Sequence, residues 1–163
     1  MLQPKTKHKI RENPSTPWNA GRSQDTADFF TIGYSGRKLE DLIDAMIQSG
    51  VRTLVDVRRN PVSMHRPEMS KSNLKRRVEE SGIAYSHLPE LGVPREIRKD
   101  PIDEIWNWYN MNVVAPFVAD LSRFLSGFQT PIALMCLEKD PRDCHRHRLF
   151  LALESKGLHG FDL

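Results

Sequence analysis

Short apolar runs alternate with segments of helical periodicity along most of this chain, and this alternation constrains the fold more than any other feature of the sequence. Apolar and β-branched residues at 29–32, 51–57, 83–86 and 130–136 predict strands, of which 51–57 is expected to be buried. Between them, apolar residues recur every three or four positions, which predicts helices at 39–47, 70–81 and 105–125. A last helix is expected to begin at Asp140 and Pro141 and to continue to Lys156.

Strands and helices in this order predict an α/β fold: a three-layer arrangement of a mainly parallel sheet flanked by helices, in a single small domain. At 163 residues with 39% hydrophobic content, the chain can bury an adequate core. We expect Pro116 to kink or divide the long helix at 105–125. Residues 1–27 are basic and proline-rich without apolar periodicity, so we expect a disordered basic N-terminal arm followed by the α/β domain at 28–163.

Composition narrows the class of protein but does not select a function. Two cysteines are too few for a disulfide framework, and no apolar run approaches the roughly 18 residues that span a bilayer. We therefore expect a cytoplasmic protein with reduced thiols and no membrane association. A net charge of +3 is compatible with an anionic partner such as nucleic acid, but this balance alone is common in unrelated proteins.

Three polar segments follow predicted strands, where parallel sheets usually bind ligands. These segments are 33–36, 56–59 and 136–146, and we expect them to converge on one crevice. In the first, Gly33, Tyr34 and Ser35 could present backbone amides to an anion, although a tight structural turn is the preferred interpretation.

The segment 136–146 contains most of the reactive side chains. Arg146 and His145 lie one turn before Phe150 and Leu149, so we expect both to face the crevice. Cys144 would lie in the first turn of the expected helix, where the helix dipole and nearby cations favour a thiolate. An inert buried cysteine is the alternative interpretation, and Cys136 at the end of a strand is more typical of a core residue.

Three chemistries could use these residues. Cys136 and Arg142 have the C-x5-R spacing of thiol phosphatases, but Glu138 and Asp140 would repel a phosphate and no glycine lets the loop wrap around it. For zinc, the candidate ligands are Cys136, Cys144, His145, His147, His65 and His87. They include no C-x2-C pair, and adjacent residues of one helix cannot easily chelate one ion, so we predict no metal site.

The third chemistry is acid–base or nucleophilic catalysis on an anionic substrate. Here Arg58 and Arg146, with Ser35, would bind the anion, while Glu138 or Asp56 moves protons and Cys144 or His145 assists. The alternative is a structural network, in which Asp56 and Glu138 pair with the two arginines.

Several of these motifs, in this order, resemble the domain-of-unknown-function 488 (DUF488) family over roughly 31–157. The resemblance is carried by Thr31-Ile32-Gly33-Tyr34-Ser35, Asp56-Val57-Arg58, Gly82-Ile83-x-Tyr85, Leu91-Gly92, and Cys136-x-Glu138 followed by Cys144-His145-Arg146. It implies a fold and a site but no reaction. The positions that match the family motifs are Asp56, Arg58, Cys136, Glu138, Cys144, His145 and Arg146.

From the residues we therefore expect an enzyme that acts on a phosphate-bearing substrate, a nucleotide or a nucleic acid. The alternative is a non-enzymatic nucleic-acid-binding module that uses the basic arm and the basic helix at 70–81. A thiol redox protein that uses Cys136 and Cys144 is a third possibility. The sequence leaves the cofactor and the oligomeric state open.

Overall fold

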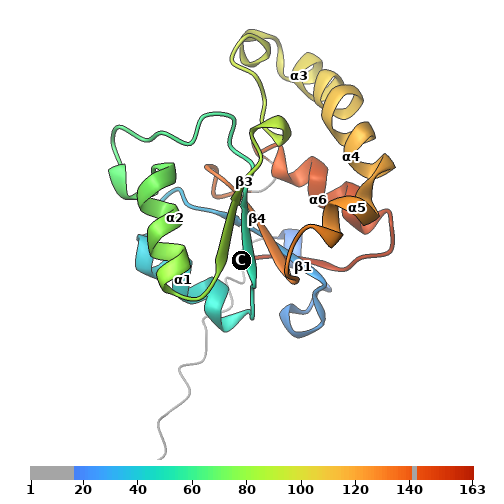
Figure 1. Cartoon of the computed structure of the whole chain (residues 1–163). Coiled ribbons are helices and arrows are strands. Elements are labelled where there is room, and N and C mark those ends of the chain that lie inside the picture. Colours follow the sequence, from blue (N-terminus) through green and yellow to red (C-terminus); the bar gives the residue numbers. More distant parts are fainter. Residues whose placement is uncertain (1–16, 141–142) are drawn as a thin grey trace, which may run out of the picture.

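A five-stranded parallel sheet forms the centre of the computed structural model, which describes residues 17–140 and 143–163 (Figure 1). The strand order is β3-β2-β4-β1-β5, and every neighbouring pair is parallel. The strands are β1 (Phe29–Gly33), β2 (Thr53–Asp56), β3 (Ala84–His87), β4 (Ile132–Cys136) and β5 (Gly160–Asp162). The helices are α1 (Leu39–Gln48), α2 (Lys71–Glu80), α3 (Ile102–Tyr109), α4 (Ala115–Ala119), α5 (Leu121–Ser126) and α6 (Arg146–Glu154). The predicted α/β class is confirmed.

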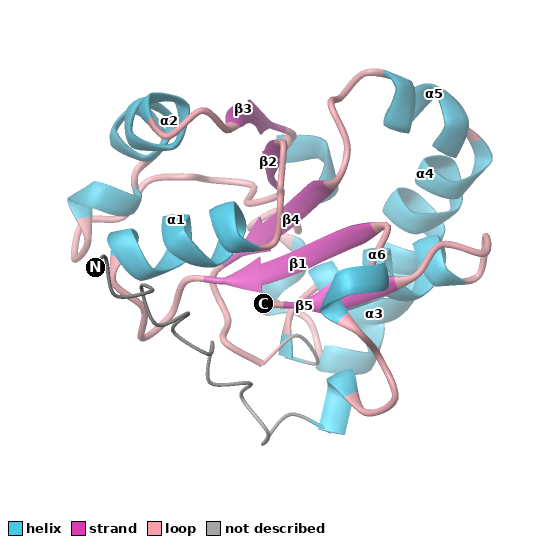
Figure 2. Ribbon diagram, turned by 90° about the horizontal axis from the view of Figure 1, so that it is seen from below, coloured by secondary structure: helices cyan, strands magenta, loops and turns pink. Residues whose placement is uncertain are grey.

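Helices cover both faces of the sheet, because successive strand residues point to opposite sides (Figure 2). On one face Leu54 of β2 packs in a cluster with residues of α1 and α2. On the other face its neighbour Val55 packs with residues of α3, α4 and α6. The two apolar clusters make the three layers that the alternation predicted. In the described part of the chain no helix is both long and apolar enough to cross a membrane.

The register of the sheet places the ends of the three central strands together. Gly33, the last residue of β1, is paired with Cys136, the last residue of β4. Asp56, the last residue of β2, is paired with Met135 and with His87 of β3. We call this side of the sheet the carboxyl edge.

Two helix boundaries differ from the sequence prediction. Helix α6 begins at Arg146 and not at Asp140, because residues 143–145 form turns before it, with the Asp143 amide bonded to the Asp140 carbonyl; the expected first-turn Pro141 lies outside the described residues. The segment 105–125 is divided at Asp120, and it also changes helix type directly before Pro116, between Val114 and Ala115. Pro116 lies in the first turn of α4, where a missing N–H costs little, and a π-helical turn at Asn110–Val114 joins α3 to α4.

Residues 17–27, which we call the N-terminal strap, pack against the domain although the sequence suggested an arm over 1–27. The Trp18 ring lies 4.2 Å from that of His147 and 5.0 Å from that of Phe150, centroid to centroid. Arg22 forms a 2.8 Å ion pair with Glu154. The expected arm at 1–16 lies outside the described residues. The packed domain therefore includes the strap, which precedes β1 in the chain.

Candidate functional site

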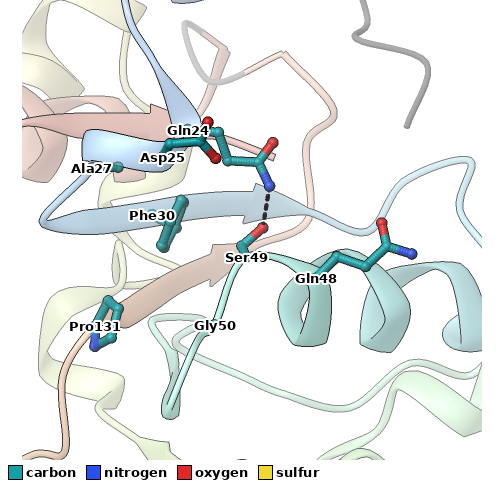
Figure 3. Close-up of a pocket in the computed structure, with 8 residues that line it drawn as sticks. All are labelled: Gln24, Asp25, Ala27, Phe30, Gln48, Ser49, Gly50 and Pro131. Carbon is teal, nitrogen blue, oxygen red and sulfur yellow. Dashed lines mark hydrogen bonds between the residues drawn. The ribbon is translucent and has the colours of Figure 1, made fainter. Parts of the chain in front are cut away.

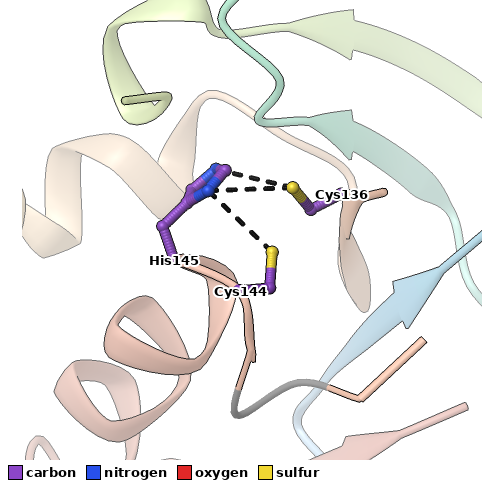
Figure 4. A group of neighbouring side chains, drawn as sticks. All are labelled: Cys136, Cys144 and His145. Carbon is purple, nitrogen blue, oxygen red and sulfur yellow. Dashed lines mark hydrogen bonds between the residues drawn. The ribbon is translucent and has the colours of Figure 1, made fainter. Parts of the chain in front are cut away.

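Two cysteines and a histidine meet at the carboxyl edge, and we call them the thiol–imidazole cluster (Figure 4). Cys136 ends β4, while Cys144 and His145 come directly before α6. His145 Nδ1 lies 3.7 Å from Cys136 Sγ and 3.9 Å from Cys144 Sγ. One donor atom from each residue lies within 4.8 Å of the others, and all three side chains are buried. Both cysteines are free thiols.

His145 is also held from a second strand, β2. Its Nε2 lies 3.1 Å from the carbonyl oxygen of Val57, the residue that follows β2. Its ring also packs against Tyr109, with ring centroids 5.5 Å apart. A proton on Nε2 would be donated to the Val57 carbonyl, and Nδ1 would then present its lone pair on the side of the two sulfurs.

Burial controls the protonation of Cys144. It raises the pKa of the Cys144 thiol well above the ordinary value, and the adjacent Cys136 raises it further. The sequence predicted a thiolate in the first turn of a helix, but Cys144 precedes α6 and is 2% exposed. The neutral thiol is therefore the favoured form of Cys144, and the residue lies before the helix and not in its first turn as predicted.

Glu138 connects the cluster to solvent. It lies two residues beyond Cys136, its carboxylate accepts a hydrogen bond from Cys136 Sγ at 3.4 Å, and the residue is half-buried. A carboxylate in this position can exchange protons both with the cluster and with water. Cys136, Glu138, Cys144 and His145 are thus brought together, as the sequence predicted for these four residues.

Arg146 is fully buried and stabilises the loop after β4. Its Nη1 donates to the Glu138 carbonyl, and its Nη2 donates to the Lys139 carbonyl at 3.1 Å and to Asp162 Oδ1 at 3.3 Å. The guanidinium therefore faces the protein interior, and this conformation does not present it to an anion.

The loop after β1 lies directly against the loop after β4. A Cβ on Gly33 would collide with the Glu138 carbonyl, its carbon lying 2.7 Å away. The amide of Tyr34 donates to the Cys136 carbonyl at 3.3 Å, and that of Ser35 donates to the Leu137 carbonyl at 2.9 Å. Since both amides have protein acceptors, the structural-turn interpretation of this loop accounts for them without an anion.

Asp56 and Arg58 form a second, separate network at the same edge. Arg58 Nε and Nη2 donate to the two oxygens of Asp56 at 2.8 and 2.6 Å, and Arg58 Nη1 donates to the Met69 carbonyl at 2.9 Å. Tyr85 also donates its hydroxyl to Asp56 at 2.6 Å. Asp56 is completely buried and Arg58 is 5% exposed. The structural alternative therefore describes this pair better than the expected anion clamp.

The basic helix α2 also has most of its charge neutralised. Lys75 lies 4.0 Å from Glu79, Arg76 lies 2.9 Å from Glu80, and Arg77 lies 3.5 Å from Glu40. These ion pairs reduce the positive field that a phosphate backbone would meet. They give no support to α2 as a nucleic-acid-binding surface.

A hollow of about 390 Å³ lies at the opposite edge of the sheet, near the starts of β1 and β4 (Figure 3). Gln24 Nε2 donates to Ser49 Oγ across it at 2.7 Å. It contains none of the residues that the sequence singled out; its lining residues are Gln24, Asp25, Ala27, Phe30, Gln48, Ser49, Gly50 and Pro131. The hollow is therefore unrelated to the thiol–imidazole cluster.

Sequence reasoning missed two groups that position the site. Asp162 of β5 pairs with Arg146 and accepts a hydrogen bond from the Thr31 hydroxyl at 2.6 Å. Nothing in the sequence around this single aspartate indicated that its side chain is buried. The Val57 carbonyl that anchors His145 is a backbone group, so no residue type could have revealed it. Both depend on strand neighbours that are far apart in the sequence.

Comparison with models of known protein families gave a match. A family model described as "Domain of unknown function DUF488" matches residues 38–153, which is more than half of the chain. Searches of curated proteins and of solved structures returned no significant match. The matched range contains Asp56, Arg58 and the whole thiol–imidazole cluster.

Proposed function

Because the chain belongs to the DUF488 family of domains of unknown function, and that membership assigns no reaction, we propose an activity from the site itself. We infer that the protein is an enzyme that performs acid–base chemistry at the carboxyl edge, on a phosphate-bearing substrate of the nucleotide class. The observation that carries this proposal is the contact of the half-buried Glu138 carboxylate with a buried cluster of two thiols and an imidazole.

Glu138 is the group proposed to transfer the proton. It is the member of the site that reaches solvent, and a positioned carboxylate of this kind contributes about 10²- to 10⁴-fold to a proton-transfer step. His145, fixed between the Val57 carbonyl and the two sulfurs, would keep the cluster and the loop after β4 in place. The reacting atom of the substrate would therefore lie beside Glu138.

The phosphate group would anchor the substrate and would not itself react, because the Glu138 carboxylate would repel a phosphate dianion placed directly beside it. Arg58 and Arg146 face the interior, so other cations would have to bind the phosphate group. We assign this role to exposed residues in the loops after β1, β2 and β4, namely Lys38, Arg59 and Lys139. Lys139 follows Glu138 directly, and all three loops lie at the carboxyl edge.

A two-stage experiment tests this proposal. Nucleoside monophosphates are first screened for binding by calorimetry at low and moderate salt, and the bound compounds are then followed for turnover by mass spectrometry. We expect Lys139→Ala to weaken binding and Glu138→Gln to lower kcat about 10²-fold or more with little change in KM. Glu96→Gln, an exposed glutamate in another loop, is the matched control. Binding that is unaffected by Lys139→Ala, or turnover that survives Glu138→Gln, would refute the assignment.

A further inference from the structure

We propose that Cys136, Cys144 and His145 bind one thiophilic divalent ion of the zinc class, with Glu138 beside its fourth coordination position. The inference deepens the proposed function, on which the catalytic meaning of the ion rests, but ion binding can be measured without any turnover. The three residues come from two chain segments, the end of β4 and the residues before α6.

The spacing of the donor atoms fits one ion. Zinc bonds of about 2.3 Å to sulfur and about 2.0 Å to nitrogen, in a tetrahedron, place sulfur and nitrogen about 3.5 Å apart. His145 Nδ1 lies 3.7 Å from Cys136 Sγ and 3.9 Å from Cys144 Sγ. All three donors lie within 4.8 Å of one another, whereas two sulfurs on one zinc are about 3.8 Å apart. Shifts of about 1 Å or less would thus close the site.

The outer contacts of His145 fit the same role. Metal-bound histidines usually donate the other ring N–H to a carbonyl or carboxylate, which fixes the tautomer and the ring orientation. His145 Nε2 lies 3.1 Å from the Val57 carbonyl, so Nδ1 is the available ligand atom. Cys136 Sγ is 3.7 Å from Nδ1 and 3.8 Å from Nε2, and ion binding would move this sulfur toward the Nδ1 side.

Charge balance also favours a divalent ion in this place. On binding, the two thiols lose their protons to solvent, the sulfurs form two bonds to the ion, and neither sulfur is oxidised. Two thiolates, a neutral imidazole and Zn²⁺ have no net charge, so a buried cluster of this composition avoids the large cost of an isolated buried charge. The two sulfur ligands select against Mg²⁺ and Ca²⁺, which prefer oxygen.

The structure removes the main reason for which no metal site was predicted from the sequence. That argument placed Cys144 and His145 on one helix, where adjacent side chains diverge. Both residues instead precede α6, in turns where Cys144 Sγ and His145 Nδ1 are 3.9 Å apart and Cys136 lies within reach of both. The missing C-x2-C pair is replaced by a strand end and a turn that the fold brings together.

Glu138 is placed to act as a base beside the fourth coordination position of the ion. Its Oε2 lies 3.4 Å from Cys136 Sγ, and it is the half-buried residue of the group. With three protein ligands, a zinc-class ion keeps one position for water or substrate, and it makes bound water a much stronger acid. A carboxylate beside that position could accept the released proton.

Metal analysis of the full chain tests the site. The protein is treated with a chelator, exchanged into buffer, mixed with Zn²⁺ and passed through a desalting column, and the retained metal is measured by plasma mass spectrometry. We expect one zinc per chain. Co²⁺ in place of Zn²⁺ should give thiolate-to-cobalt charge-transfer absorption and the red-region bands of a tetrahedral site. We also expect two protons to be released per zinc near neutral pH.

Variants separate the site from adventitious binding. Cys136→Ser and Cys144→Ser should each lose the retained zinc and the thiolate–cobalt band, while Glu138→Gln should keep both with about 10- to 100-fold weaker affinity. His159→Ala, at an exposed histidine, is the matched control and should bind as the wild type does. Circular dichroism shows whether each variant is folded.

Either of two results would overturn the metal site: wild-type protein that retains no zinc and gives no thiolate–cobalt band, or a folded Cys144→Ser variant that retains one zinc. Failure of the proposed enzyme appears differently, as stoichiometric zinc with no binding or turnover of any nucleotide. Turnover that persists after complete removal of metal would refute the catalytic use of the ion and leave the enzyme proposal standing.

Discussion

Gly33 shows how one residue sets the distance between two loops at the site. It ends β1 opposite Cys136, and the Glu138 carbonyl and Arg146 Nη1 occupy the space that a Cβ would need. The Glu138 carbonyl is in turn held by Arg146. A side chain here would therefore have to displace the loop that carries Glu138, and with it the approach to the cluster.

We predict that Gly33→Ala destabilises the protein by about 1–3 kcal/mol, because the added methyl overpacks against backbone that a buried arginine holds in place. Urea unfolding followed by circular dichroism measures the change. Gly127→Ala is the control: its Cβ would meet Phe124 O at 3.4 Å, an ordinary contact after a small shift, so we expect a far smaller effect. Equal stability of both variants would contradict this account of Gly33.

The Asp56–Arg58 pair makes a second prediction at the residue scale. Asp56→Asn keeps the shape of the side chain but leaves the Arg58 charge buried without its counter-ion, which should cost about 3–5 kcal/mol. The exposed pair Arg76–Glu80 is the control, and Glu80→Gln should cost less than about 1 kcal/mol. The free energy of unfolding in urea distinguishes the two cases. A loss at Asp56 as small as that at Glu80 would be contrary to this prediction.

At the scale of elements, the N-terminal strap is held onto α6 by a charged contact. Arg22 Nε and Nη2 donate to the two oxygens of Glu154 at 3.1 and 2.8 Å, and the Arg22 guanidinium lies over the rings of Trp18 and Phe150. The hydrogen bond from Arg22 is the main cause of a lowered pKa for Glu154. The strap should therefore respond to acid.

The sign of this response follows from the direction of the shift. A carboxyl group whose pKa is lower in the folded state stabilises the fold above its unfolded pKa of about 4.3 and loses this effect as the pH falls through the folded pKa. We predict that Glu154→Gln lowers the melting temperature at pH 7, at a cost of about 1 kcal/mol or less, and that the difference from wild type shrinks below about pH 4. Glu96→Gln serves as the control. A difference that grows on acidification would contradict the assignment.

The elements also show which parts of the fold could be predicted from the sequence. Apolar runs and helical periodicity correctly predicted β1 to β4 and the two helix layers, because burial on two faces leaves a strong pattern. The three-residue β5 is too short to leave such a pattern and was not predicted. The start of α6 was wrong because Asp140 and Pro141 look like a helix start, while tertiary contacts of the buried Arg146 hold the preceding loop in turns. The strap was missed since its one large apolar anchor among residues 17–27, Trp18, has no periodic neighbours.

The sequence indicated which of the candidate side chains lie close together, but not how each of them is oriented. Cys136, Glu138, Cys144 and His145 were correctly placed together, because strand ends meet at one edge of a parallel sheet. The sequence could not show that Arg58 and Arg146 face inward. That outcome depends on acceptors such as Asp162 and the Met69 carbonyl, which come from distant segments.

At the scale of the whole molecule, the cluster is enclosed by packing from both the sheet and the helices. Cys136 is 4% exposed and Cys144 is 2% exposed, and both belong to the apolar core on the face of α3, α4 and α6. A reagent can reach these sulfurs only when part of the molecule opens. Their reactivity therefore reports on the opening of this half of the fold.

We predict that Ellman's reagent, with a chelator present, modifies two thiols per chain at least about 10³-fold more slowly in the native protein than in urea. The rate should follow the stability of the fold, so that Asp56→Asn accelerates the reaction of both thiols. Native protein in which one thiol reacts as fast as free cysteine would show instead that the loop after β4 opens by itself.

The strand order has a consequence for how the protein is made. β1 and β2 are synthesised early, but they are not neighbours: β4 lies between them and pairs with both. Before residues 132–136 leave the ribosome, the N-terminal strand has no partner on either side, because its other neighbour, β5, comes later still. The nascent chain must keep an apolar strand unpaired for most of its synthesis, and the arrival of β4 is the step that joins β1 to β2 and brings Cys136 to the carboxyl edge, where Cys144 and His145 follow.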